Sequence, residues 1–207
     1  MSKPKTKKNV EQEKKEKIAL KPKAKKKAGG QGKRKGSAFE REIAKKLSLW
    51  FSEGEREDIF YRSHNSGGRF TARQKSQKDT AYQSGDITCS DPLGEHLISK
   101  WSIECKSGYG NWGVLDFVDS RQYITKLESF FQQCCEDAHK ANKEPILIFR
   151  RKGKKTCICL AKEYINHLEA FNGKLEKIHV EVHSQWMPVV IIGFDDFLNW
   201  ITSPQTI

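Results

Sequence analysis

Three charged residues in the middle of the chain, Asp86, Glu104 and Lys106, have apolar neighbours. Ile103 and Cys105 alternate with Glu104 and Lys106, which predicts a half-buried strand that carries the glutamate and the lysine on one face. A neighbouring strand that carries Asp86 would bring its carboxylate close to that of Glu104. Two such carboxylates raise each other's pKa unless a cation lies between them, and oxygen-only ligands favour Mg²⁺ or Mn²⁺.

Lys106 would add a positive charge beside such a metal site. An ammonium group in that position can orient a water molecule and stabilise the negative charge that develops on a phosphate under attack. The alternative is structural, because a Glu-x-Lys triplet also forms ordinary salt bridges on exposed strands.

Glu40 is a candidate for a third carboxylate. It follows Ser37 at the spacing of a capping box, and apolar residues recur at helical spacing from Phe39 to Trp50, which predicts a helix over 37–52. Glu40 lies near the buried side of this helix. It either caps the helix or completes a metal site with Asp86 and Glu104.

Turn residues and hydrophobic periodicity predict the other elements. A strand ends at Arg62, a polar loop follows over 63–85, and strands at 86–89 and 97–106 flank a turn at 91–94 and form a β-hairpin. The remaining predictions are a helix at 114–141, strands at 146–149 and 156–160, a helix at 162–171, strands at 177–183 and 188–193, and a helix at 194–202. This order predicts an α/β fold with a mixed central β-sheet flanked by helices.

Charge is distributed unevenly along the 207 residues, whose formal net charge is +12. Residues 1–35 contain 15 Lys and Arg against three Glu, so the surplus lies in this segment and the body behind it is neutral. Such a composition predicts a solvated tail that binds a polyanion, most simply nucleic acid, although a solubilising tail or a nuclear address signal has the same composition. No apolar stretch is long enough for a membrane helix or a secretory signal, and the six cysteines contain no CxxC pair. We therefore expect an intracellular protein with reduced thiols.

An ordered set of motifs resembles the PD-(D/E)XK nuclease superfamily, and in particular the Holliday junction resolvases of archaeal type and their phage-like relatives. The motifs are the sequence KGSAFEREI at 35–43, Arg62–Ser63, Gly85–Asp86–Ile87 and Ile103–Glu104–Cys105–Lys106, and the similarity covers residues 33–150. The resemblance implies a restriction-endonuclease-like core. The sequence departs from the superfamily pattern in three ways. Gly85 replaces a proline, the segment between Arg62 and Asp86 is long, and the tail and the region after residue 162 have no counterpart.

The same resemblance implies roles for individual residues. Asp86, Glu104 and the Cys105 carbonyl would hold the metal ion, with Glu40 as a further acidic ligand or a support for the bound water. Lys106 would be the catalytic lysine. Arg62 and Ser63 would lie near the scissile phosphate, and Gln122 matches a glutamine of some relatives.

Basic residues in the predicted loop 63–85 suggest a second contact with DNA. Arg69, Arg73 and Lys75 could follow a phosphate backbone near the active site. The alternative is a mobile, solvated loop.

These observations predict a metal-dependent DNA endonuclease that hydrolyses phosphodiester bonds, using Mg²⁺ or Mn²⁺ and no small-molecule cofactor, with branched DNA as the favoured substrate. The alternatives are a non-enzymatic nucleic-acid-binding protein that relies on its basic tail, and a restriction-type endonuclease that cuts duplex DNA. We expect a tail at 1–35, a nuclease core at 36–161 and an α/β extension at 162–207 packed on the core. We also expect a homodimer without membrane attachment, located in the cytoplasm at the nucleoid in a prokaryotic or phage context and in the nucleus of a eukaryote.

Overall fold

The computed structural model describes residues 29–63, 84–108, 125–183 and 187–202, together with residues 110, 113, 116, 204 and 207. The chain divides into residues 1–30 and 31–207, and the fold described below is that of the second part. Its elements are α2 (Gly29–Phe51), β1 (Phe60–Arg62), β2 (Ile87–Cys89), α4 (Pro92–Lys100), β3 (Trp101–Ser107), α6 (Lys126–Lys140), β4 (Glu144–Arg150), β5 (Thr156–Ala161), α7 (Lys162–Asn172), β6 (His179–His183), β7 (Pro188–Gly193) and α8 (Phe194–Trp200).

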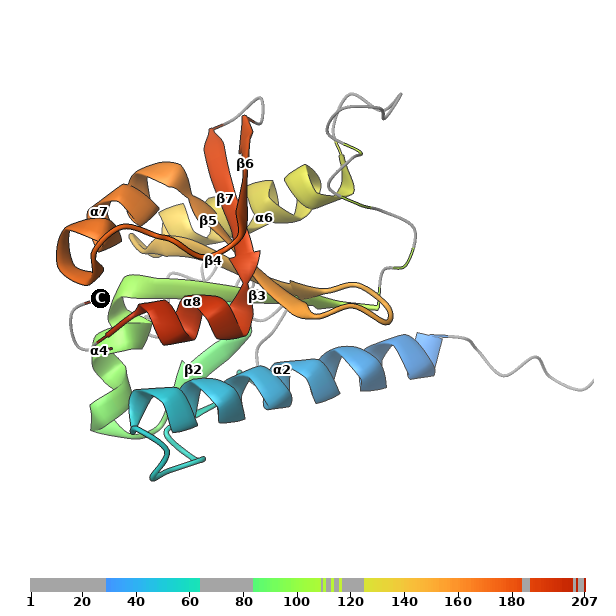
Figure 1. Ribbon diagram of the computed structural model, residues 1–207. Helices are drawn as coiled ribbons and strands as arrows, with labels where there is room; N and C mark the ends of the chain where they lie inside the picture. Colours follow the sequence, from blue (N-terminus) through green and yellow to red (C-terminus); the bar gives the residue numbers. More distant parts are fainter. Residues whose placement is uncertain are drawn as a thin grey trace, which may run out of the picture. The chain divides into compact units, whose positions relative to one another are not determined.

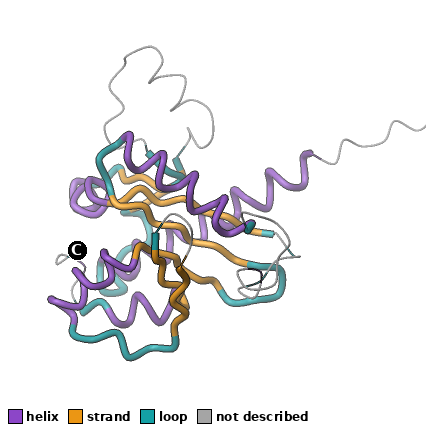
Figure 2. The backbone as a smooth tube through the Cα atoms, turned by 90° about the horizontal axis from the view of Figure 1, so that it is seen from above, coloured by secondary structure: helices purple, strands orange, loops and turns teal. Residues whose placement is uncertain are grey.

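The central sheet has five strands in the order β3-β4-β5-β7-β6. β3 and β4 are parallel, and the other neighbours are antiparallel. Helix α6 packs on one face of the sheet and α2, α4, α7 and α8 pack on the other (Figures 1 and 2). Strand β4 shows the alternation that this requires, because Ile146 and Ile148 belong to one hydrophobic cluster and Leu147 and Phe149 to the other. The predicted α/β fold with a mixed, helix-flanked sheet is confirmed.

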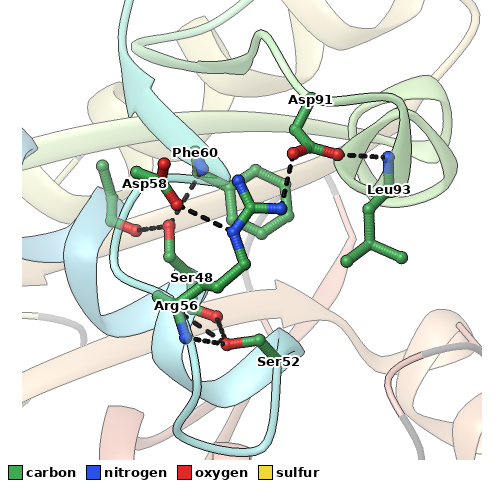
Figure 3. A network of polar contacts seen from close by, with 8 residues as sticks. Ser48, Ser52, Arg56, Asp58, Phe60, Asp91 and Leu93 are labelled. Atoms are coloured by element: carbon green, nitrogen blue, oxygen red, sulfur yellow. Dashed lines mark hydrogen bonds and ion pairs between the residues drawn. The ribbon is translucent and has the colours of Figure 1, made fainter.

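A separate two-stranded sheet, β1 with β2, lies between α2 and the edge of β3. A polar network fixes the loop that leads into it (Figure 3). The Ser48 hydroxyl accepts a hydrogen bond from the Phe60 amide at 2.9 Å, and the Arg56 guanidinium donates to Asp91 at 2.6 Å. Asp91 in turn caps α4 by accepting from the Leu93 amide at 2.9 Å. The end of α2, the start of β1 and the start of α4 are therefore linked by side chains.

Two sequence-based predictions in the N-terminal half of the chain are wrong. The first helix starts at Gly29 rather than at residue 37, so Ser37 lies inside it and is not its cap. Lys33, Arg34 and Lys35 are good helix formers, and the helix extends through them although Gly32 and Gly36 on either side are not. The predicted hairpin at 86–106 contains helix α4 instead of a turn, and β2 pairs with β1. Asp91 is the N-cap of α4, and Pro92 lies in its first turn. An Asp-Pro sequence is common at the start of a helix as well as in a turn.

Helix α6 is shorter than the predicted span 114–141. Thr125 has extended backbone and forms a capping box with Glu128, so the helix begins at Lys126. Strands β4 to β7 and helices α7 and α8 lie close to their predicted positions, within about three residues at each end. β6 and β7, from the predicted C-terminal extension, belong to the central sheet and share its core. None of the helices in the described ranges is both long and apolar enough to cross a bilayer.

Candidate active site

β3 is an edge strand, and its free side bonds to the segment that precedes β2. The Asp86 amide donates to the Ile103 carbonyl at 2.7 Å, and the Asp86 carboxylate accepts from the Cys105 amide at 2.9 Å. Gly85 allows this approach: its φ is +82°, and a Cβ there would lie 2.5 Å from the Ile103 carbonyl oxygen. Proline holds φ near −65°, so it cannot adopt this backbone. The departure from the PD pattern therefore has a conformational cause.

Glu104 and Lys106 extend from β3 toward α6. Their side chains form an ion pair and are both largely buried. The Lys106 ammonium also donates to the Gln133 side chain at 3.2 Å and lies 5.5 Å from the centre of the Phe130 ring. The ammonium is thus held beside the Glu104 carboxylate by a glutamine and an aromatic ring of α6.

Burial and like charge disfavour ionisation of the two carboxylates. Asp86 is 7 % exposed, and burial together with the Glu104 charge raises its pKa to about 8, against the opposing hydrogen bond from the Cys105 amide. Burial also raises the pKa of Glu104, and the charge of Asp137 adds to this, while Lys106 opposes it. Glu40 raises the pKa of both groups by its negative charge. The site is therefore short of positive charge for the carboxylates that it contains.

Glu40 reaches this region from α2, where it is 8 % exposed. Its carboxylate forms an ion pair with Arg62 at the end of β1. The next residue, Ser63, is buried, and its amide donates to the Asp86 carbonyl at 2.7 Å. The structure thus brings Glu40, Arg62 and Ser63 next to the Asp86 segment.

Cys105 can contribute to the site only through its backbone. Its side chain faces the hydrophobic core, and burial raises the pKa of the thiol well above its usual range. The N–H and C=O of one strand residue point to the same side of the strand, so the Cys105 carbonyl faces the free edge where its amide meets Asp86.

Within the described ranges, no three His, Cys, Asp or Glu side chains lie close enough together to hold a metal ion as they stand. The ion pairs explain why: Glu104 is turned toward Lys106, and Glu40 toward Arg62. The chemistry of the donor set nevertheless fits a hard divalent cation, because it consists of carboxylates and one backbone carbonyl. Such an ion would also relieve the repulsion that raises the pKa of Asp86.

Some predicted residues lie outside the described ranges, namely Arg69, Arg73, Lys75 and Gln122. Two residues of α6 were missed. Gln133 contacts Lys106, and Asp137 acts on Glu104 by its charge. Phe130, Gln133 and Asp137 follow one another at helical spacing, so they share the face of α6 that meets the site. This spacing was visible in the sequence, but nothing in it shows that this face lies against β3.

A family model described as "Phage putative PDDEXK endonuclease" matches residues 31–206. The chain belongs to this family of phage PD-(D/E)XK endonucleases. No curated protein and no solved structure matches the chain significantly. The match to the phage endonucleases continues past residue 150, where the recognisable motifs end, and includes β6, β7 and α8. The protein is a nuclease, and nucleases of this superfamily generally use divalent metal ions.

Proposed function

We propose that this phage endonuclease hydrolyses phosphodiester bonds of DNA with Mg²⁺, or with Mn²⁺ in its place, and that branched DNA such as a four-way junction is its preferred substrate. One observation carries the proposal: Asp86 is buried beside Glu104 at the open edge of the sheet, with too little positive charge nearby to neutralise both. In the absence of a cation, two buried carboxylates side by side lower the stability of the folded protein. Asp86 and Glu104 are also the acidic residues of the superfamily motif.

The residues that would hold the ion are Asp86, Glu104 and the Cys105 carbonyl, with Glu40 as a further carboxylate. When bound, the ion supplies a hydroxide-like water and neutralises charge on the phosphate. Asp86 is positioned for this by its hydrogen bond from the Cys105 amide. Glu40 is held by Arg62, which is partly open to solvent and can reorient, whereas Glu104 is held by the largely buried Lys106.

Lys106 and Arg62 provide the positive charge that the reaction needs. The Lys106 ammonium would orient the attacking water and stabilise the developing charge on the phosphate, a role favoured by its fixed contacts with Gln133 and Phe130. Arg62 would leave Glu40 for a phosphate oxygen, because a guanidinium binds carboxylate and phosphate in the same geometry. Ser63, next to it, fixes the backbone through its bond to Asp86.

The test is cleavage of labelled four-way junction and linear duplex DNA of the same sequence, by the full chain with Mg²⁺, Mn²⁺ or EDTA. Asp86→Asn, Glu104→Gln and Lys106→Ala are expected to lose cleavage by at least about 100-fold, and the wild type is expected to cut the junction faster than the duplex. Variants that cut as well as the wild type would refute the site. Discrete bands from plasmid DNA would indicate a restriction-type endonuclease, and metal-independent binding without cleavage would indicate a DNA-binding protein.

Two further features belong to the same proposal. A junction resolvase cuts two strands at related positions, so we propose a homodimer with two active sites. Its place of action would be the cytoplasm, at the nucleoid DNA. Mass measurement of the purified chain, alone and on a junction, tests the dimer.

A further inference from the structure

The turn between β4 and β5 is a dense cluster of positive charge. Five of the six residues from Arg150 to Lys155 are lysine or arginine, and the chain has no acidic residue between Glu144 and Glu163. The body of the protein is otherwise balanced in charge, because the surplus of the whole chain lies in residues 1–35. The turn is therefore a local positive surface on a neutral domain.

Lys152, Lys154 and Lys155 are exposed, and none of them forms an ion pair with an acidic side chain of the described residues. Some other surface lysines differ in this respect: Lys45 pairs with Glu57 at 2.7 Å, and Lys46 pairs with Asp195 at 2.8 Å. Like charges on adjacent residues repel one another, and a polyanion relieves that repulsion.

The base of the turn is tied to the helix that carries Glu40. Both terminal nitrogens of Arg150 donate to the Glu42 carboxylate, at 2.7 and 2.8 Å, and the guanidinium lies 4.6 Å from the centre of the Phe39 ring. Phe39 and Glu42 flank Glu40 on α2. Arg150 thus fixes the turn relative to the candidate active site and is itself engaged.

The strand register gives the distance along the sheet from Lys106 to the turn. Lys106 pairs with Phe149, and Ser107 with Arg150, so the turn extends beyond the end of β3 that carries the active-site residues. Lys152 follows Phe149 by three residues, which is about 10 Å of extended chain. One DNA strand carries a charge about every 3.4 Å along the helix axis, so this distance corresponds to about three nucleotides before the length of the lysine side chain is added. In both overall views the turn extends toward the same side of the molecule as the N-terminal half of α2 (Figures 1 and 2).

We propose that the turn of residues 151–155 binds the phosphate backbone of a duplex arm on one side of the scissile bond, about three to five nucleotides from it. This inference rests on the proposed endonuclease function and specifies its substrate: the cut must be flanked by duplex on that side. Lys152, Lys154 and Lys155 supply the phosphate contacts, and Arg150 holds the turn in place.

The first experiment measures DNA binding by the full chain in EDTA, where no cleavage occurs, over a range of salt concentrations. The triple variant Lys152→Gln, Lys154→Gln, Lys155→Gln is compared with a control that removes the same charge, Lys140→Gln, Lys174→Gln, Lys177→Gln. The control residues lie on other segments: Lys140 ends α6, and Lys174 and Lys177 lie between α7 and β6, the edge strand that β7 separates from β5. We expect the turn variant to bind duplex and junction about 10-fold more weakly and to lower the salt slope by about two to three, with the control close to wild type.

The second experiment locates the contact. A photoreactive p-azidophenylalanine replaces Lys154, and the crosslinked nucleotide is mapped relative to the cleavage site. Crosslinks about three to five nucleotides from the cut, in duplex, support the inference, whereas crosslinks elsewhere or in single-stranded regions overturn it. If the wild type cuts DNA and the turn variant binds like the control, the inference fails and the proposed function stands. If the turn variant loses binding but the wild type never cuts, the turn binds DNA and the proposed function fails.

Discussion

Asp86→Asn should stabilise the metal-free protein, and the gain should depend on pH. The asparagine keeps the shape of the side chain and can accept the hydrogen bond from the Cys105 amide through its own carbonyl oxygen. It removes the charge that is buried beside Glu104. A catalytic or ligand residue whose neutral replacement raises stability is the expected sign of a site built for function rather than for the fold.

The sign and size of this change in the free energy of unfolding follow from the pKa of Asp86, which rises from 3.8 to about 8 on folding. Below pH 3.8 the carboxyl is neutral in both states, so it has no effect. Between pH 3.8 and about pH 8 the folded state keeps a proton that the unfolded state has lost, so wild-type stability falls by about 1.4 kcal/mol per pH unit as pH rises. The complete shift sets an upper limit of about 6 kcal/mol above pH 8. Because the edge of the sheet can admit water when the group ionises, we expect Asp86→Asn to gain about 2–4 kcal/mol at pH 8.5 and almost nothing near pH 4.

The assay is urea unfolding of the full chain in EDTA at several pH values from 4.5 to 9. Asp58→Asn serves as the control, because Asp58 is an exposed aspartate, and its effect should stay within about 0.5 kcal/mol at every pH. Excess Mg²⁺ at pH 8 should stabilise the wild type and leave Asp86→Asn unchanged, since an ion that binds only the folded state raises its stability by mass action. Parallel pH profiles for wild type and Asp86→Asn would show that Asp86 ionises freely in the folded protein, and the electrostatic argument for the site would fail.

Other predictions follow from single contacts. Lys106→Gln should lower cleavage of saturating DNA by about 100-fold or more while changing the dissociation constant less than about 3-fold, measured by single-turnover kinetics and binding in EDTA. Gly85→Ala should lower the free energy of unfolding by more than about 3 kcal/mol. Gly54→Ala is the control, because Gly54 has a φ of +94° with open space around it, and it should cost about 1 kcal/mol. Equal losses would show that the contact with Ile103 is unimportant. Glu42→Gln should cost only about 0.5–1 kcal/mol in urea unfolding because its ion pair with Arg150 is partly exposed, but it should weaken DNA binding as the turn loses its anchor, and unchanged binding would contradict that role.

The sequence predicted most of the central sheet because the strands β4, β5 and β7 are short apolar runs bounded by turns. It failed at 91–100, where Asp-Pro-Leu-Gly fits both a turn and a helix start, and the choice depends on Leu97 and Ile98 being buried against other elements. It also failed at Ser37, where a capping motif lies within a longer helix. In each case local sequence allowed two structures, and tertiary packing selected one.

The positions of two predicted residues on β3 agree with the sequence pattern, whereas the predicted connections around them do not. Strand alternation correctly placed Glu104 and Lys106 on one face of β3, and Asp86 lies beside β3 although the hairpin that was to bring it there does not exist. Gln133 and Asp137 of α6 could not be chosen from the sequence, because the pairing of α6 with the face of β3 depends on contacts between distant segments.

The position of Asp86 at a sheet edge connects the architecture to the chemistry. An edge strand exposes backbone groups that would otherwise pair with another chain, and β3 uses those groups to hold the segment at Gly85 and Asp86. The bond from the Cys105 amide fixes the carboxylate, and no side chain of the described residues forms an ion pair with it, so burial and the Glu104 charge keep the pKa of Asp86 high. A neighbouring strand in that place would have satisfied the edge equally well, but it would have covered the side of β3 from which a phosphate would approach in the mechanism that we propose. The irregular backbone at Gly85 therefore does two things at once: it pairs with the edge of the sheet, and it holds a buried carboxylate whose ionised form a bound cation would stabilise.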